Sequence, residues 1–230
     1  MKLGQNKKTG HLAGLLYVLL ALTGMFGILY VPTQLIVGDD PVQTALNIQN
    51  NEFLYRAGIM AQLACQTLFV YLVLTLYQLF KKVNKTYTIQ MVTLVVVSIP
   101  ISFTIMAFQV AGLVMSNEPE YLSSFDSEQL NALSLMFYKL YQQGVIIAQI
   151  FWGLWLIPFG LLVYQSKFLP KLIGIFLVAG GVGYVIASTR ILLFPDVSDL
   201  VDQIATIPSA LGEFSAMLWL LIKGIKENKN

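Results

Sequence analysis

Charged residues are scarce in this sequence. Asp, Glu, Lys and Arg make up 11% of its 230 residues, whereas 57% of the residues are hydrophobic. A soluble globular chain carries about 25% charged residues, and a soluble core of this size does not absorb the deficit. The composition therefore predicts a membrane protein. The net charge is only +2, so no broad basic field indicates a nucleic-acid partner.

Cysteine and histidine occur once each. Cys65 stands alone inside an apolar run, so the chain has no internal disulfide framework. His11 is the only histidine, which excludes a multi-histidine metal site. The sequence also lacks an H-E-x-x-H motif, a histidine available to activate a serine, and paired aspartates within the apolar runs. These absences disfavour an enzyme, and no residue pattern indicates a metal or a cofactor.

Long apolar runs are what the sequence has instead. A helix needs about 20 apolar residues to cross a hydrocarbon core of about 30 Å. The first run is longer than the apolar region of a signal peptide and has no clear A-x-A site after it, so we expect a retained span. No linker divides the chain, and we predict one all-α integral membrane domain over residues 1–230. Its six predicted spans are 12–31, 53–80, 89–115, 130–165, 172–194 and 207–222.

Helix-boundary residues mark several of the connections. Asp40-Pro41 suits an N-cap followed by a first-turn proline, which predicts a short outer interfacial helix before the second span. Asp126 with Gln129 resembles a capping box at the start of the fourth helix. Pro158 is expected to kink the inner end of that long helix. Thr206 with Pro208 is expected to open the sixth helix.

Basic residues gather in alternate connections. Eleven of the 14 Lys and Arg residues lie before the first span, between spans two and three, between spans four and five, and after the sixth, whereas ten of the 12 acids lie in the other three connections. Basic residues stay on the cytoplasmic side. We therefore expect a multi-pass protein of the cell membrane with both termini cytoplasmic and an acidic outer surface. The eleven are Lys2, Lys7, Lys8, Lys81, Lys82, Lys85, Lys167, Lys171, Lys223, Lys226 and Lys229.

Three segments resemble a known membrane family. They read HLAGLLYVLLALTGMFG, FLYRAGIMAQL and FWGLWLIPFGLLVYQSKFLPKLIGIFLVAGGVGY. All three are similar to the domain of unknown function 4386 family, and the resemblance covers residues 12–222. It implies an uncharacterised, mainly bacterial six-span bundle, hence a bacterial inner membrane, with no established activity. Many members carry a histidine in the fourth helix, where this sequence has tyrosine, glutamine and tryptophan, so we do not expect a histidine-based mechanism.

Three spans each present a polar stripe. Polar side chains are costly in lipid and normally face protein or water. The spacing therefore favours either hydrogen bonding between helices or a polar pocket open to the outside, and both interpretations stay open. The stripes are Tyr55, Gln62 and Gln66; Ser98, Ser102 and Gln109; and Asn131, Tyr138, Gln142 and Gln149.

Four charged residues depart from the loop pattern. At a rise of about 1.5 Å per residue, Arg56, Lys139 and Arg190 lie near the outer boundary, where long side chains reach water. Arg190 also shares a face with a row of small residues, so we expect it to point at protein. Glu213 is the deepest charge, about 15–20 Å above the inner boundary. We expect Glu213 to pair with Arg190 or with Lys139, or to bind a proton or a ligand.

One outward-facing polar cavity is our hypothesis for the site. It is predicted to be lined by Glu213, Arg190, Lys139, Arg56, Gln142, Tyr138, Gln109 and Gln62. The first interpretation is a sensor or accessory protein that binds a small lipid-like or amphipathic molecule. The alternative is a small-solute or proton-coupled transporter that uses Glu213, and an intramembrane enzyme comes third. The inner halves of the spans have few polar residues, which favours binding over a continuous path.

Small-residue faces add a further potential partner. Gly10 and Gly14 form a GxxxG pair near the inner end of the first span. Such a pair allows close helix packing within the chain or dimerisation. The expected partners are therefore the lipid bilayer, a small amphipathic ligand and, through these faces, a second copy of the chain.

Overall fold

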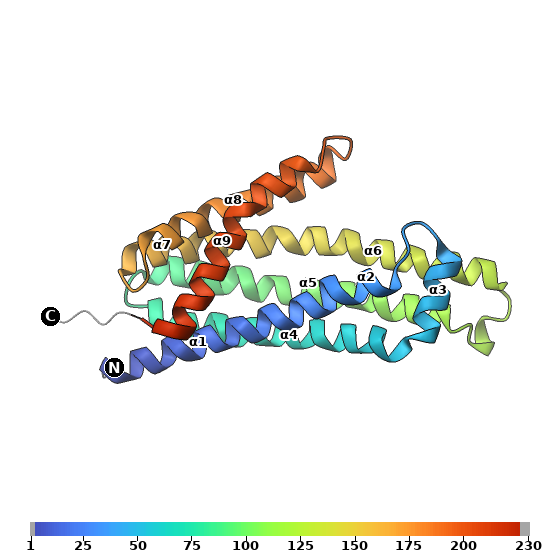
Figure 1. Ribbon diagram of the computed structural model, residues 1–230, viewed down its shortest axis with the longest axis horizontal. Coiled ribbons are helices and arrows are strands. Elements are labelled where there is room, and N and C mark those ends of the chain that lie inside the picture. Colours follow the sequence, from blue (N-terminus) through green and yellow to red (C-terminus); the bar gives the residue numbers. More distant parts are fainter. Residues whose placement is uncertain (1–2, 226–230) are drawn as a thin grey trace. The chain divides into compact units, whose positions relative to one another are not determined.

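The computed structural model describes residues 3–225, and within them it is helical throughout, apart from short connections, with no strand (Figure 1). Six segments are long and apolar enough to cross a membrane: Lys7–Leu35, Glu52–Phe80, Lys85–Ser116, Ser127–Ser166, Lys171–Leu193 and Leu200–Lys223. The predicted all-α, six-helix architecture is therefore confirmed, and the protein is an integral membrane protein. Three of the predicted basic-cluster residues, Lys2, Lys226 and Lys229, lie outside the described residues.

The described chain has eleven helical elements. In order they are α1 Leu3–Gly24, η1 Met25–Tyr30, α2 Val31–Leu35, α3 Pro41–Asn50, α4 Glu52–Phe80, α5 Lys85–Ser116, η2 Glu120–Leu122, α6 Ser127–Leu154, α7 Leu156–Ser166, α8 Lys171–Leu193 and α9 Leu200–Lys223. Nine of these elements build the six spans, and two, α3 and η2, lie in connections. The first span joins α1, the π-helical turn η1 and α2, and the fourth joins α6 and α7.

Two predicted helix starts form as their residues dictate. The Asp40 carboxylate accepts a hydrogen bond of 2.9 Å from the backbone N–H of Gln43, so Asp40 caps the short helix α3. At the start of α6, Asp126 Oδ1 accepts from the Gln129 backbone at 2.8 Å, and Gln129 Oε1 accepts from the Asp126 backbone at 3.0 Å. This reciprocal pair is the predicted capping box.

The break between α6 and α7 has a proline as its cause. Pro158 has no N–H to donate, and its ring clashes with the carbonyl four residues earlier, which belongs to Leu154. α6 ends at Leu154, and Trp155 interrupts the helix before α7 begins. The expected kink is therefore a short interruption three residues before the proline.

The predicted start of the sixth helix was wrong. α9 begins at Leu200, six residues before Thr206, and Pro208 lies inside the helix. A proline is tolerated within a membrane helix when nearby hydroxyls and neighbouring helices satisfy the backbone groups around it. The carbonyl that lacks its usual donor is that of Ile204; beside it, the Thr206 hydroxyl donates to the Asp202 carbonyl and the Ser209 hydroxyl donates to the Thr206 carbonyl, each at 2.7 Å. Pro208, which the sequence suggested as a residue of the first helical turn, therefore lies in the middle of the helix.

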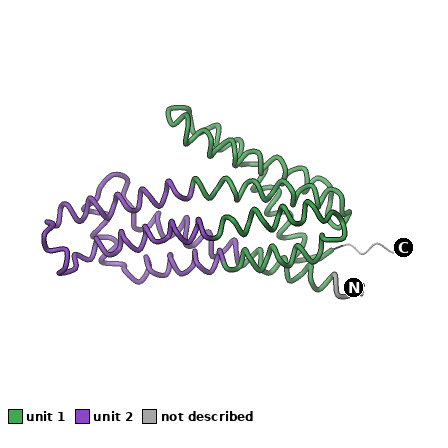
Figure 2. The backbone as a smooth tube through the Cα atoms, turned by 180° about the vertical axis from the view of Figure 1, so that it is seen from behind, with its two compact units in different colours: residues 1–19, 67–99, 146–230 green, residues 20–66, 100–145 purple. Residues whose placement is uncertain are grey.

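The chain forms two compact units (Figure 2). Unit 1 comprises Met1–Leu19, Thr67–Ile99 and Ile146–Asn230, and unit 2 comprises Leu20–Gln66 and Pro100–Val145. Helices α1, α4, α5 and α6 contribute residues to both, whereas α7, α8 and α9 belong wholly to unit 1. The single domain expected from the sequence stays a prediction, and each unit has a core of its own.

Unit 1 is centred on aromatic side chains. The Trp155 ring stacks on Phe159 with centroids 5.2 Å apart and meets the Phe69 ring edge-on at 5.0 Å. Phe80 continues the row, at 6.0 Å from Phe159 and 5.8 Å from Phe168. Aromatic pairs at these separations are favourable beyond the area that they bury. The interior of unit 1 is therefore an apolar aromatic core.

Glycines let the helices of unit 1 approach backbone to backbone. A Cβ added to Gly183 of α8 would overlap the carbonyl oxygen of Ala205 in α9, and one on Gly180 would overlap Ser209. A Cβ on Gly14 of α1 would overlap the backbone of Leu221. Small residues at these crossings allow the close packing that holds membrane helices together.

Unit 2 has an aliphatic core built mainly from α2, α3, α4 and α5. Val31, Leu35, Ile48, Tyr55 and Leu113 are all buried and pack in one cluster. The short helix α3 is held on this cluster through Ile48, which is 1% exposed. The cluster fixes α4 beside α5 and so positions their polar stripes.

Candidate functional site

The predicted ion pair of Glu213 with Arg190 or Lys139 was wrong. Lys139 Nζ lies 2.9 Å from Asp39 Oδ1, and Arg190 binds Asp202. Arg56 pairs with Glu52 one helical turn away, and its side chain is 59% exposed. Each cation thus pairs with a carboxylate other than Glu213. Exposed pairs such as those of Arg56 and Lys139 contribute little to stability.

Arg190 ties together the connection between α8 and α9. Its guanidinium binds both carboxylate oxygens of Asp202, with Nε 3.0 Å from Oδ1. It also donates to the backbone carbonyl of Val197 at 2.9 Å and to that of Pro195 at 3.4 Å. The Arg190 side chain is only 14% exposed, so the expectation that it points at protein is confirmed. The guanidinium thus makes four hydrogen bonds that hold the turn.

Glu213 has a phenol as its partner. The Tyr17 hydroxyl, from α1, donates to Glu213 Oε2 of α9 at 2.8 Å. Tyr17 is buried at 3% exposure, and its ring lies 6.3 Å from that of Trp155. Of the three ion pairs among the described residues, none includes Glu213. The Glu213 carboxylate is therefore held by a neutral hydrogen-bond donor.

Tyr17 and Glu213 lie along a close contact between α1 and α9. Toward the helix ends, His11 Nδ1 donates to the carbonyl oxygen of Leu221 at 2.8 Å. Gly14, between His11 and Tyr17, packs on the Leu221 backbone. The glycine face predicted for packing or dimerisation is thus used within the chain. We call Gly14, Tyr17, Glu213 and Leu221 the α1–α9 contact.

A hydrogen-bonded chain crosses the interior of unit 2. The Tyr141 hydroxyl of α6 donates to Gln62 Oε1 of α4 at 2.7 Å, and Gln62 Nε2 donates to the Gly27 carbonyl at 3.0 Å. Gly27 lies in the π-helical turn η1. A π-helical turn departs from the regular i→i−4 ladder and is frequent at functional sites. The side chain of Gln62 therefore bridges α6 to an irregular turn of the first span.

Three more side chains join this chain in a buried polar cluster. The Tyr55 hydroxyl donates to the backbone carbonyl of Gln109 at 3.2 Å, and the rings of Tyr138 and Tyr141 lie 5.8 Å apart. Each of the five side chains involved is at most 4% exposed. We call this set the tyrosine–glutamine cluster: Tyr55, Gln62, Gln109, Tyr138 and Tyr141.

Several buried oxygens in and beside the cluster have no hydrogen-bond partner. They are Gln109 Oε1, Gln66 Oε1 and Ser102 Oγ. Gln66 follows Gln62 by one helical turn, and Ser102 precedes Gln109 by two turns, so all three lie on the helix faces that carry the cluster. A buried acceptor left unpaired costs about 1–3 kcal/mol. These oxygens are therefore placed to accept hydrogen bonds from a further group.

The eight predicted site residues divide between the two units. Gln62, Gln109 and Tyr138 belong to the tyrosine–glutamine cluster, whereas Arg56, Lys139 and Gln142 are exposed residues of the same unit. Arg190 and Glu213 belong to unit 1. A single cavity that all eight line stays a prediction.

Sequence reasoning missed two tyrosines, Tyr141 and Tyr17. Tyr141 follows Tyr138 by three residues and so lies on its face, which was a usable signal. Tyr17 stands in a strongly apolar run, and nothing near it in the sequence marks it as polar. Within residues 3–225, no group of three or more His, Cys, Asp and Glu side chains is arranged to hold a metal ion.

Comparison with known proteins gives one match. A family model described as Domain of unknown function (DUF4386) matches residues 12–224. No curated protein and no solved structure matches the chain. The match covers the segments on which the resemblance was based, so that resemblance is confirmed.

Proposed function

This chain belongs to the domain of unknown function 4386 family, and because the family lends no activity, we propose a function from the buried polar groups themselves. The protein binds a neutral, amphipathic small molecule at the tyrosine–glutamine cluster and acts as a membrane-embedded sensor or accessory protein. The observation that carries the proposal is the set of unpartnered oxygens of Gln66, Gln109 and Ser102. Buried polar atoms in native proteins normally have partners, and exceptions call for one.

The groups of the cluster select the chemistry of the ligand. Two carboxamide oxygens accept hydrogen bonds, so the ligand supplies hydroxyl or amide N–H donors. None of the five residues of the cluster is charged, which favours a neutral ligand. The rings of Tyr55, Tyr138 and Tyr141 give apolar faces against which a hydrocarbon or ring system packs. A lipid-like molecule with a small polar group meets all three conditions.

Orientation in the membrane is part of the proposal. The start of α1 lies against the end of α9, where a Cβ on Gly10 would be 3.0 Å from the backbone nitrogen of Ile225. This proximity supports placing both chain ends on one side, and the lysines of the described chain on that side support a cytoplasmic location for it. The protein then lies in the cell membrane with Asp39, Asp126 and Asp199 outside.

Transport driven by protonation of Glu213 is the second candidate. It is favoured by one observation: Glu213 is a carboxylate within an apolar span. Among the described residues, the side chain that hydrogen-bonds to it is that of Tyr17. Intramembrane ionisable groups commonly mark ion and proton pathways. The aromatic core of unit 1 weighs against this candidate, because a continuous polar path needs hydrated groups where Trp155, Phe159 and Phe80 lie.

The test uses full-length protein purified in mild detergent. Bound small molecules are extracted from it and quantified by mass spectrometry. We expect Gln66→Leu and Gln109→Leu to lower retention of the copurified molecule about fivefold to tenfold, because each removes a ligand hydrogen bond worth about 1–1.5 kcal/mol. Gln143→Leu, at an exposed glutamine of α6 in the same unit, is the matched control and should retain it. Ligand-free Gln66→Leu should also unfold at a higher temperature, since it removes an unpaired buried acceptor.

Three outcomes contradict the proposal. One is protein that carries no small molecule, and another is a loss in Gln143→Leu equal to that in Gln66→Leu. The third is proton-coupled uptake in proteoliposomes that Glu213→Gln abolishes while Gln66→Leu leaves it intact. That result favours transport through Glu213.

A further inference from the structure

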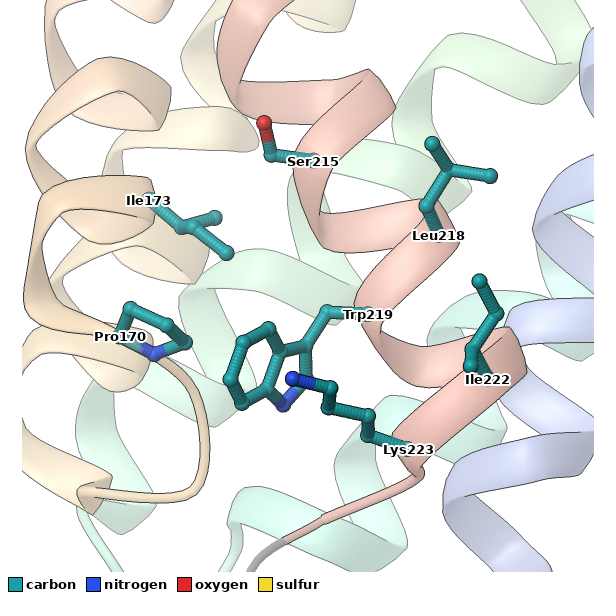
Figure 3. A pocket seen from close by; sticks show the side chains of 7 residues that line it. All are labelled: Pro170, Ile173, Ser215, Leu218, Trp219, Ile222 and Lys223. Atoms are coloured by element: carbon teal, nitrogen blue, oxygen red, sulfur yellow. The ribbon is translucent and has the colours of Figure 1, made fainter.

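A groove runs along the C-terminal half of α9, beside the start of α8 (Figure 3). Its volume is about 370 Å³, and its walls are Ile173, Leu218, Trp219 and Ile222. Ser215 marks the end within the span, and Lys223, the last residue of α9, marks the other end. All lining residues belong to unit 1. We call this the α9 groove.

The groove has the length of an acyl-chain site. Ser215 and Lys223 are eight residues apart, which is about 12 Å along a helix. One leaflet of a bilayer core is about 15 Å deep. A groove that starts at the end of a span and runs for this distance into it therefore follows the direction of a lipid tail.

Positive charge lies at one end of the groove only. The Lys223 ammonium stands 4.3 Å from the centroid of the Trp219 ring, and Figure 3 shows the two groups side by side. Lys171, the first residue of α8, adds a second cation at the same end of the helix pair, because α8 begins where α9 ends. Within residues 3–225, no acidic residue lines the groove. The arrangement is complementary to a molecule with an apolar tail and an anionic head.

We propose that the α9 groove binds an anionic phospholipid, with one acyl chain along Leu218 and Ile222 and the phosphate beside Lys223. The indole of Trp219 lies at the boundary between the apolar walls and the charged end, as interfacial tryptophans do. Basic residues at the membrane surface attract anionic lipids. This site is separate from the tyrosine–glutamine cluster and does not depend on the function proposed for that cluster.

The test counts lipids retained by the full-length protein in native mass spectrometry, with phosphatidylglycerol or phosphatidylcholine added to the detergent solution. Wild-type protein should retain phosphatidylglycerol in preference to phosphatidylcholine. Lys223→Gln should weaken phosphatidylglycerol retention about fivefold, the effect of one lysine charge near an anionic lipid surface. Ser215→Trp should weaken retention of both lipids, because the indole fills the end of the groove.

Two control variants match these changes. Lys81→Gln removes another lysine of unit 1 that also lies over an aromatic ring, 5.8 Å from the Tyr77 centroid. Ala210→Trp adds the same indole at an exposed small residue of α9, five positions from Ser215 and so on another face. Both controls should retain phosphatidylglycerol as the wild type does.

Four results overturn the proposal. They are equal retention of the two lipids, an equal loss in Lys81→Gln and Lys223→Gln, unchanged retention in Ser215→Trp, and displacement of phosphatidylglycerol by excess inorganic phosphate. The last result means that the lysine end alone binds an anion and that the apolar walls contribute nothing.

Discussion

Glu213 meets a tyrosine in the apolar interior, although sequence reasoning expects a cation there. Burying a second charge beside a carboxylate carries a desolvation cost that the attraction between the two charges does not always offset. A phenol is neutral and brings a large apolar ring together with one hydrogen-bond donor. Tyr17 therefore satisfies Glu213 at a lower cost of burial than Arg190 or Lys139 would.

Tyr17→Phe tests how much this hydrogen bond contributes to the free energy of unfolding. The change keeps the ring beside Trp155 and removes only the donor to Glu213. We expect the free energy of unfolding in detergent to fall by about 0.6–1.7 kcal/mol, the range for polar contacts between membrane helices. Glu213→Gln should cost less, because a carboxamide oxygen still accepts from the Tyr17 hydroxyl.

Tyr71→Phe is the control for that measurement. Tyr71 lies on α4 in the same unit and is 59% exposed. Its substitution should leave the free energy of unfolding unchanged. A loss in Tyr71→Phe as large as that in Tyr17→Phe would show that the effect does not come from the bond to Glu213.

Among the elements, α8 and α9 depend on small residues and on one arginine. Gly180 and Gly183 bring the α9 backbone onto α8, and Arg190 holds the turn that joins them through Asp202 and two backbone carbonyls. The helix pair is thus fixed by close packing along its length and by charge-assisted hydrogen bonds at its end. Arg190 already makes four hydrogen bonds within the protein. To bind a ligand in the predicted cavity, it would have to give up some of these bonds.

The α1–α9 contact makes its own prediction. Gly14→Ala places a Cβ on the backbone of Leu221, where no side chain can move aside. Overpacking of this kind costs about 1–3 kcal/mol. We expect the midpoint of thermal unfolding in detergent to fall accordingly, while the helix content measured by circular dichroism stays the same.

Gly24→Ala supplies the comparison within the same helix. A Cβ on Gly24 would meet only the Cys65 sulfur, at 3.3 Å, and alanine favours the helix by up to about 1 kcal/mol over glycine. This variant should therefore be as stable as the wild type or more so. If the two alanine variants unfold together, close approach at Gly14 is not what holds α1 against α9.

For the whole molecule, the alternation of basic and acidic connections predicts which loops face which side. We expect cysteine reporters at Ser123 and Ser198, placed in a Cys65→Ala background, to react with a membrane-impermeant maleimide in intact cells. A reporter at Lys82 should react only after the membrane is permeabilised, because lysine-rich connections stay in the cytoplasm. Labelling of Lys82 and Ser123 from the same side would contradict six crossings with both ends inside.

The sequence by itself determined the existence of the six spans and the caps at Asp40 and Asp126, because both are local properties. A run of apolar residues crosses the bilayer whatever it packs against. A capping side chain such as Asp40 or Asp126 binds a backbone group three residues away. The polar stripe residues Gln62, Gln109 and Tyr138 could likewise be placed on helix faces from their spacing alone.

Only the tertiary structure decided which groups meet. Tyr17 and Glu213 are 196 positions apart, and Tyr141 and Gln62 are 79 positions apart. Helical spacing gives the face of each residue but not the neighbour of that face or the depth at which two helices touch. Those follow from the glycines that set each helix crossing and from the competition among nearby partners. As a result, Arg190 binds Asp202, and Glu213 accepts a hydrogen bond from the Tyr17 phenol.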